Sequence, residues 1–231
     1  MWCPMNALLR LLQLTDSSFP TGGYAFSHGI EGLHAMGLLR DEAGVREVAQ
    51  THIAETLARL ELPAVSHAHI AAGEADFSAL VALDHLLTLL KPVPAIRAAS
   101  ARMGRRLLEA ALPLYPSPTG DRLLAAVREG PASGHHAVAF GVVAQGAGIG
   151  RDEALAGFAA AALNGYVAAA VRLGVIGQAA AQRVITGLEA DLAAAIAAAP
   201  GVALAEMGGY APLLDIAGMR QPDLPARLFA S

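Results

Sequence analysis

The side chains best suited to chemistry lie close together in residues 19–31, which read FPTGGYAFSHGIE. A serine, a histidine and an acidic residue occur here within five positions, as Ser27, His28 and Glu31. Nucleophilic catalysis needs the serine and its base to face each other, but neighbours at i and i+1 on a helix point apart. The G-x-S-x-G pattern of serine hydrolases is also absent from the sequence. The residues alone leave two interpretations open, a surface that binds a partner and an ordinary interhelical turn.

Two close pairs of histidines raise the question of a metal site. On a helix, the rings of His67 and His69 would diverge by about 160°, and the adjacent His135 and His136 would also point apart. The H-E-x-x-H motif is absent, and the only cysteine, Cys3, lies next to the N-terminus. We therefore predict no metal site, and we interpret His135 and His136 as polar groups at the start of a helix.

Nucleotide chemistry finds no support in the sequence either. The only lysine, Lys91, lies in LLKPVP, whereas a P-loop needs a lysine directly after its glycine-rich turn. Residues 139–155 imitate a dinucleotide fingerprint, but Arg151 stands where the third glycine of G-x-G-x-x-G belongs. These residues instead predict a helix end, a glycine turn and a new helix that begins near Arg151. A single lysine also argues against Schiff-base chemistry.

The composition is that of a globular protein with a large core. The chain has 231 residues, 55% of them hydrophobic, and a formal net charge of −4. That charge gives no reason to expect nucleic acid or a membrane surface as a partner. The N-terminus lacks the regions of a signal peptide, and no uninterrupted apolar run reaches about 18 residues. We expect a soluble cytoplasmic protein, which the single cysteine also favours.

Helical periodicity dominates the sequence, and strand-like alternation is nearly absent. Between residues 151 and 173, for example, apolar side chains recur at three- and four-residue steps, with acidic residues in the first turn and Arg172 in the last. We predict an all-α, compact single-domain bundle of about ten helices that spans residues 1–231. The expected helices cover residues 5–15, 25–37, 41–61, 64–72, 76–90, 94–112, 119–129, 136–148, 151–173 and 178–198.

Two terminal segments differ from this helical body. Residues 1–24 combine the first helix with the glycine-rich loop. Residues 200–231 hold four prolines and four glycines, so a long helix cannot form there, but they are too apolar for a free tail. We expect this less regular C-terminal tail to dock on the body or on a partner. Gly29 and Gly32, three residues apart, open one helix face for the close approach of another backbone.

Five stretches, spread over essentially the whole chain, carry a family resemblance. They read LLQLTDSSFPTGGYAFSHGIE, SARMGRRLLEAA, HHAVAFGVVAQGAG, AAVRLGVIGQAAAQRV and YAPLLDIAGMRQPDLPARLFAS. Together they resemble the UreF family of urease accessory proteins, the first as its N-terminal signature and the last as its closing segment. The tail departs from the family at Gln221, where a histidine is common, and at Pro225 and Ala226, where the family has tyrosine and serine. Tail contacts that depend on those side chains are therefore in doubt.

The resemblance implies an all-α homodimer that is not an enzyme and needs no cofactor. UreF-like proteins join UreD, also called UreH, and recruit the nickel-carrying GTPase UreG. The complex docks on the apo-urease subunits and delivers nickel to the active site. The opening loop and the tail are then partner-binding surfaces. The residues expected to bind partners are Tyr24, Ser27, His28, Glu31, Arg220, Arg227, Leu228 and Phe229.

Two alternatives stay open beside this adaptor role. The protein could regulate the GTPase UreG by supplying an arginine in trans, which can be worth a factor of about 10³–10⁵ in rate. It could also bind nickel through its histidines as a metallochaperone. GTP turnover by UreG with and without the protein would test the first alternative. Stoichiometric nickel uptake by the isolated chain would test the second.

Overall fold

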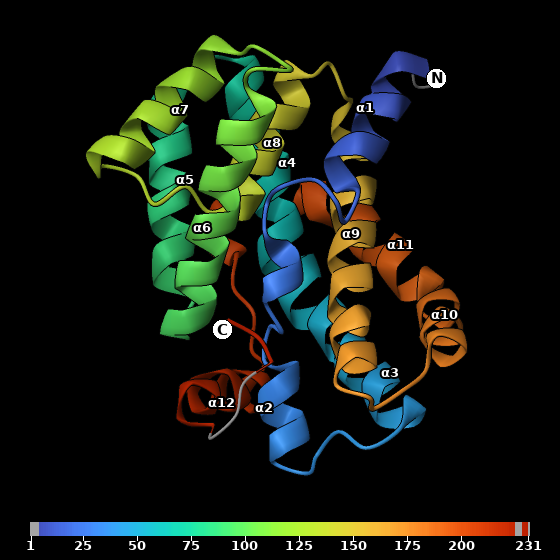
Figure 1. Cartoon of the computed structure of the whole chain (residues 1–231). Coiled ribbons are helices and arrows are strands. Elements are labelled where there is room, and N and C mark those ends of the chain that lie inside the picture. Colours follow the sequence, from blue (N-terminus) through green and yellow to red (C-terminus); the bar gives the residue numbers. More distant parts are fainter. Residues whose placement is uncertain (1–4, 225–227, 231) are drawn as a thin grey trace.

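Helices form the regular structure of this chain (Figure 1). The computed structural model describes residues 5–224 and 228–230, and no β-strand occurs among them, which confirms the all-α prediction. The α-helices are α1 Met5–Thr15, α2 Ile30–Ala35, α3 Glu42–Thr51, α4 Leu62–Gly73, α5 Phe77–Leu90, α6 Pro94–Ala111, α7 Pro118–Glu129, α8 His136–Gly146, α9 Arg151–Arg172, α10 Gln178–Gly187, α11 Glu189–Ala198 and α12 Pro212–Arg220. A π-helix, η2, spans His52–Glu61, and short 3-10 turns are η1 Gly23–Ala25, η3 Ala199–Gly201, η4 Leu204–Glu206 and η5 Gln221–Asp223.

Two apolar helices, α4 and α8, form the centre of the bundle. Most of their residues are buried on every side, as expected for helices that other helices enclose. α4 packs against α8, with α5, α6 and α7 on one side of the pair and α9, α10 and α11 on the other (Figure 1). α1 packs along α9. The segments that build the candidate site are held against this central pair.

The segments α3, η2 and α4 form one continuous helical rod, where the periodicity predicts two helices, over 41–61 and 64–72. Pro63 lies in the first turn of α4 and has no N–H to donate to the preceding turn. The carbonyl of Arg59, four residues earlier, instead accepts a hydrogen bond of 3.0 Å from the N–H of Gly208. The C-terminal segment thus donates to a backbone carbonyl that receives no hydrogen bond from Pro63. π-Helical segments are frequent at functional sites, and η2 lines the cavity described below.

The helix expected over residues 25–37 is much shorter in the structure, because α2 begins only at Ile30. His28 and Gly29 have positive φ angles of 51° and 90°. Glycine adopts this left-handed conformation without steric cost, whereas a histidine there is strained, a feature that clusters at functional sites. The two residues interrupt the right-handed helix and turn the chain between η1 and α2.

The helices α9 to α11 form one flank of the bundle. α9 is long and apolar enough to cross a membrane by length and composition alone, but half of its most apolar window is buried against other parts of the chain. The core helix of a globular protein has the same character. The helix expected over 178–198 is divided at Leu188, and α10 is bent by 47° from the segment Glu189–Gly201.

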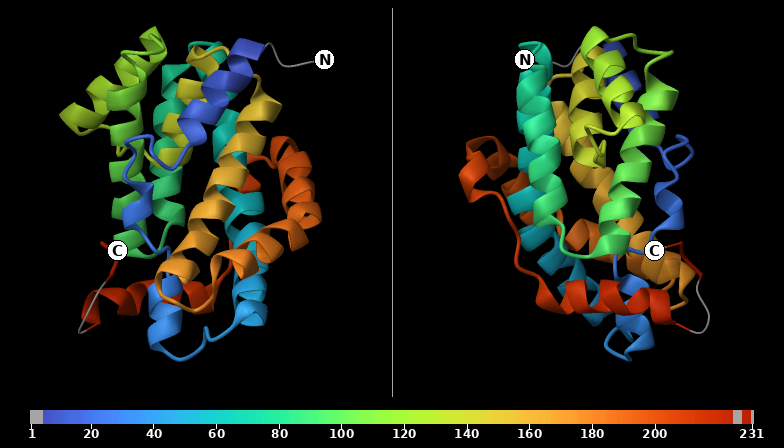
Figure 2. Two further views of the ribbon diagram at one scale, coloured as in Figure 1. Left: turned by 45° about the vertical axis from the view of Figure 1, so that its right-hand side comes forward. Right: turned by 90° about the vertical axis from the view of Figure 1, so that its left-hand side faces the viewer.

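The C-terminal tail docks on the body, as expected. α12 lies beside α2 at one end of the bundle, and the views in Figure 2 agree on this placement. The chain end then returns to the opening loop, where the N–H of Ala230 donates a hydrogen bond of 2.8 Å to the carbonyl of Ala25. The first and last parts of the sequence therefore meet.

Candidate functional site

The opening loop and the C-terminal tail form one composite surface, although they lie at opposite ends of the sequence. α2 and α12 pack so closely that a Cβ at Gly32 would overlap the carbonyl group of Ala217. A Cβ at Gly29 would lie 3.2 Å from the carbonyl oxygen of Leu214. The close approach predicted from Gly29 and Gly32 is confirmed, and the approaching backbone is that of the tail.

Buried hydrogen bonds join the two segments. The Ser27 hydroxyl donates to Oε1 of Gln221 at 3.1 Å, and Nε2 of Gln221 donates to Oε2 of Glu31 at 2.7 Å. The backbone N–H of Leu228 donates to the other Glu31 oxygen at 2.6 Å. Gln221 is 1% exposed, and Glu31 and Ser27 are also buried. We call Ser27, Glu31 and Gln221 the tail lock.

The glutamine at position 221, which departs from the family pattern, suits this lock. An amide side chain offers one carbonyl acceptor and one NH₂ donor. Gln221 uses the acceptor toward the Ser27 hydroxyl and the donor toward the Glu31 carboxylate. Gln221 therefore forms a side-chain link between tail and loop in this chain.

An arginine from α9 holds the exposed part of the surface in place. The Arg172 guanidinium lies 3.8 Å from the ring centre of Tyr24 and 4.1 Å from that of Phe229. It also donates a hydrogen bond to the Tyr24 carbonyl. Cation–π contacts of this kind hold an aromatic ring in one orientation. Tyr24 remains 63% exposed, and the neighbouring Leu228 is 55% exposed.

The predicted partner-binding residues divide into two groups. Exposed to solvent are Tyr24, Arg220 and Leu228. Buried between tail and body are Ser27, Glu31 and Phe229. His28 faces the cavity described next, and Arg227 lies outside the described residues. Within one chain the buried group holds the tail on the body, and its part in partner binding stays a prediction.

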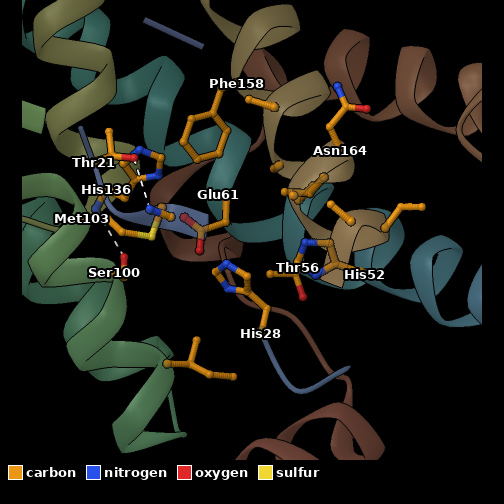
Figure 3. Close-up of a pocket in the computed structure, with 18 of the residues that line it drawn as sticks. Thr21, His28, His52, Thr56, Glu61, Ser100, Met103, His136, Phe158 and Asn164 are labelled. Atoms are coloured by element: carbon orange, nitrogen blue, oxygen red, sulfur yellow. Dashed lines mark hydrogen bonds between the residues drawn. The ribbon is translucent and has the colours of Figure 1, made fainter. Parts of the chain in front are cut away.

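Behind the loop lies a cavity of about 750 Å³. Residues from η2, α6, α8 and α9 line it, together with parts of the opening loop and of the tail. In Figure 3, Glu61 lies near the centre, with His28 next to it and with His52 and His136 to either side. The cavity thus brings together ionisable groups from four separate segments.

Glu61 and Lys91 form a buried ion pair in the wall of this cavity. The Nζ of Lys91 donates a hydrogen bond to Oε1 of Glu61. The side chain of Lys91 is 5% exposed and that of Glu61 is 13% exposed. Burial by itself raises the pKa of Glu61, but the charge and the hydrogen bond of Lys91 outweigh it and lower that pKa. Glu61 is therefore ionised at neutral pH. The only lysine of the chain is thus engaged inside the protein.

The histidines around the cavity are neutral at neutral pH. Burial lowers the pKa of His52 from 6.5 to about 3 and that of His136 to about 4. Burial also lowers the pKa of His28, although the Glu61 carboxylate acts in the opposite direction. Desolvation disfavours the charged imidazolium. Neutral imidazoles beside a carboxylate can donate and accept hydrogen bonds or bind a soft cation.

His52 is held by stacking on Tyr166. The ring centres lie 4.3 Å apart and the planes differ by 4°. Tyr166 is almost fully buried, and its hydroxyl has no hydrogen-bond partner among the described residues. Burial raises the pKa of this hydroxyl, so Tyr166 stays protonated. The ring serves as a packing surface that orients His52 in the first turn of η2.

The other histidine pairs have structural roles. The ring of His67 bonds the carbonyl of Val202 at 2.9 Å, and that of His69 bonds the carbonyl of Ile149 at the same distance. His135 is a polar group at the start of α8, as expected, and its backbone N–H donates to Asp84 at 2.7 Å. Across residues 5–224 and 228–230, no group of three or more histidine, cysteine, aspartate or glutamate side chains is arranged to hold a metal ion.

Sequence reasoning missed that His52, Glu61 and Lys91 meet at one cavity. A signal was present, since Glu61 lies four residues after the inward-facing Leu57 and so falls on the same helix face. Lys91 also stands alone as a lysine between apolar neighbours. A charged residue on an apolar face indicates a buried partner or a cavity.

The fold defines an all-helical protein whose opening loop and C-terminal tail form one composite surface. A sequence profile of the UreF family matches residues 39–189 of the chain. The urease accessory protein UreF of Arthrobacter sp. (strain FB24) is 35% identical over 223 residues, 96% of each chain. The corresponding protein of Bacillus sp. (strain TB-90) is 31% identical over 98% of this chain and 100% of its own length, and that of Methylobacterium radiotolerans is 33% identical over 99% of both.

This chain belongs to the UreF family of urease accessory proteins. The resemblance seen in the sequence is therefore confirmed. Proteins of this family are non-catalytic urease accessory proteins.

Proposed function

We propose that this protein is the adaptor of a nickel-insertion complex. Together with a UreD-type partner, it recruits a UreG-type GTPase to the apo-urease subunits and performs no chemistry on a substrate. The observation that carries this proposal is the composite surface. On this surface the side chains of Tyr24 and Leu228 are exposed, and the buried tail lock joins the loop to the tail.

The composition of this surface fits a protein interface. A large aromatic side chain offers much contact area at low entropic cost, and Arg172 already holds Tyr24 in one orientation. Leu228 adds an apolar contact next to it. A surface that is ordered before binding loses less conformational freedom when the partner docks.

Capture of the GTPase tests the proposal. Tyr24→Ala should weaken capture of a UreG-type protein by the complex with UreD about thirtyfold or more, as expected for an aromatic interface centre. Tyr210→Ala is the matched control, since Tyr210 is 79% exposed but lies in the segment before α12, where its N–H donates to the Glu55 side chain of η2. Equal capture by both variants would remove Tyr24 from the interface.

The tail residue Arg227 stays a predicted partner contact. Arg227→Ala should leave the protein folded and weaken its complex with UreD or UreG. Lower urease activation in cells that express this variant would support the prediction, and wild-type activation would contradict it.

Regulation of the GTPase is the second candidate function. Two exposed arginines of α6, Arg102 and Arg106, lie beside the same loop, and an arginine can stabilise the transition state of phosphoryl transfer. GTP turnover by the UreG-type protein, measured with and without this chain, separates the two. Unchanged turnover favours the adaptor role.

We place the complex in the cytoplasm.

A further inference from the structure

Three arginines surround the opening loop, and none of them belongs to an ion pair in the described part of the chain. Arg102 lies 5.1 Å from the ring centre of Phe26, and Arg172 packs on Tyr24. The guanidinium of Arg106 lies where a Cβ of Gly22 would be. The three side chains therefore meet the same five-residue stretch from two helices, α6 and α9.

α6 also carries a carboxylate, that of Glu109, but its ion pairs are with other arginines. Arg105 bonds Oε1 of Glu109 at 3.0 Å, and Arg128 of α7 reaches the same oxygen at 3.6 Å. Glu109 is thus shared by Arg105 and Arg128. Among the described residues no carboxylate forms an ion pair with Arg102 or Arg106, in a chain whose formal net charge is −4.

The unpaired guanidinium groups are also preorganised. Arg102 and Arg106 are four residues apart on α6, so their Cα atoms are separated by about 6 Å along the helix axis. The contacts with Phe26 and Gly22 restrict both side chains before any partner arrives. A restricted guanidinium loses less rotamer entropy on binding a carboxylate, and it can bind that carboxylate through two N–H groups.

We propose that Arg102 and Arg106, with Tyr24 of the adjoining loop, form a docking site for an acidic segment of a partner protein. The segment carries two carboxylates about 6 Å apart, the spacing of acidic residues at i and i+4 on a helix. This inference rests on the proposed function, because it names the chemistry by which the composite surface recognises its partner.

A protein segment fits this surface better than a nucleic acid or a membrane. Nucleic-acid and lipid surfaces are bound by extended basic stripes on domains of high positive charge. Here a small cationic patch adjoins exposed Tyr24 and Leu228 on an acidic chain. Arginine next to aromatic and aliphatic side chains is typical of the energetic centre of protein interfaces.

Binding kinetics test this site. The full-length protein is immobilised, and the UreD-type and UreG-type proteins are added in turn at about 50 mM and about 300 mM salt. Arg102→Ala/Arg106→Ala should lower the association rate constant of one partner about tenfold or more at low salt. It should also flatten the salt dependence. Arg105→Ala/Arg128→Ala removes two positive charges from the adjoining arc and should behave as wild type.

Each other outcome overturns the inference in a distinct way. Wild-type kinetics in Arg102→Ala/Arg106→Ala, with Tyr24→Ala defective, would refute the acidic docking site and leave the adaptor role intact. An equal fall of the association rate constant in the two double variants would show that the rate depends only on the net charge of the protein, which would refute the site. Competition by a single-stranded RNA at similar concentration would indicate a general polyanion surface. If Arg102→Ala/Arg106→Ala unfolds, the wild-type protein alone provides the test. An association rate constant of the wild-type protein that is the same at low and high salt would then refute the site. If neither partner binds the wild-type protein, the proposed function itself fails.

Discussion

At the scale of single residues, buried polar side chains decide how the two ends of this chain are joined. The side-chain amide of Gln221 accepts a hydrogen bond from the Ser27 hydroxyl and donates one to the Glu31 carboxylate. One amide thus bonds two buried polar groups. A buried hydrogen bond adds little net stability, but removing one partner leaves the other desolvated. The tail lock should therefore be sensitive to truncation.

Gln221→Ala tests the lock. We expect the free energy of unfolding to fall by about 1–3 kcal/mol, the cost of leaving a buried polar group unsatisfied. The tail should also become more sensitive to limited proteolysis. Gln50→Ala is the control, because exposed Gln50 bonds only Asp191 at the surface, and it should change stability by less than about 0.5 kcal/mol. Urea unfolding of both variants gives the answer, and equal stability would contradict the lock.

The half-buried histidines of the cavity give the protein a defined response to acid. His52 and His136 have pKa values near 3 and 4 in the folded state, against 6.5 ordinarily, because burial disfavours their charged forms. Below about pH 6.5 the unfolded chain binds protons that the folded chain does not, so stability falls as the pH falls toward 4. Above pH 7 both states are neutral and this contribution is constant.

We expect the free energy of unfolding to decrease between pH 6.5 and pH 5 by up to about 1.4 kcal/mol per pH unit for each of these two histidines. Urea unfolding at several pH values measures the slope. The double variant His52→Asn/His136→Asn should show a flatter profile. An equal slope in the variant would show that other groups cause the acid response.

At the scale of elements, the contact between α2 and α12 depends on a missing side chain. Gly32→Ala would place a Cβ against the backbone of Ala217, so we expect a loss of about 1–3 kcal/mol as the helices separate. Gly165→Ala is the matched control, because Gly165 lies within α9 with no atom within 4 Å of its would-be Cβ. That variant should gain about 0.5–1 kcal/mol from helix propensity. Thermal unfolding of both variants tests the contact, and destabilisation by both would refute it.

The ion pair between Glu61 and Lys91 links η2 to the segment that joins α5 and α6. Lys91→Met would leave the Glu61 carboxylate buried without its partner, which costs about 3–5 kcal/mol. Replacing both residues, as Glu61→Leu/Lys91→Met, should recover most of that loss, because a well-packed apolar pair removes two desolvated charges. Chemical unfolding of the single and double variants gives the comparison. A double variant as unstable as the single one would mean that the cavity needs its charges.

At the scale of the whole molecule, exposed apolar stripes support assembly with other chains. The outer face of α1 exposes Met5, Leu9 and Leu12, and α12 exposes Leu213 and Ile216. Contiguous apolar surface of this kind usually marks an interface. That the chain is a homodimer, and that it forms a single domain, both stay predictions.

We expect a dimeric mass in solution at micromolar concentration, measured by sedimentation. Leu9→Glu and Leu213→Glu each place a charge in the middle of one stripe, and the variant that yields monomers identifies the stripe that joins the two copies. Dimers in both variants would exclude both stripes. A monomeric wild-type protein would contradict the dimer prediction.

Most helices, the close approach at Gly29 and Gly32, and the family of this protein could be predicted from the sequence, because the signals for them are local. Periodicity at three- and four-residue steps predicted most helices within one or two residues, including α9 with Asp152 and Glu153 in its first turn. The spacing of Gly29 and Gly32 predicted a close backbone approach. The motifs around the loop and in the tail identified the family. Each of these signals lies within one short segment, so no knowledge of distant contacts was needed.

Only the tertiary structure decided which distant groups meet. That the approaching backbone is α12, that Gln221 bonds Glu31, and that Glu61, Lys91 and three histidines share a cavity all depend on packing between segments far apart in sequence. Local propensity also failed where packing outweighed it, as in the continuous rod through η2, where Gly208 satisfies a carbonyl that Pro63 cannot. Burial, which sets both the stability of these contacts and the charge of the histidines, is a property of the folded chain and not of any one segment.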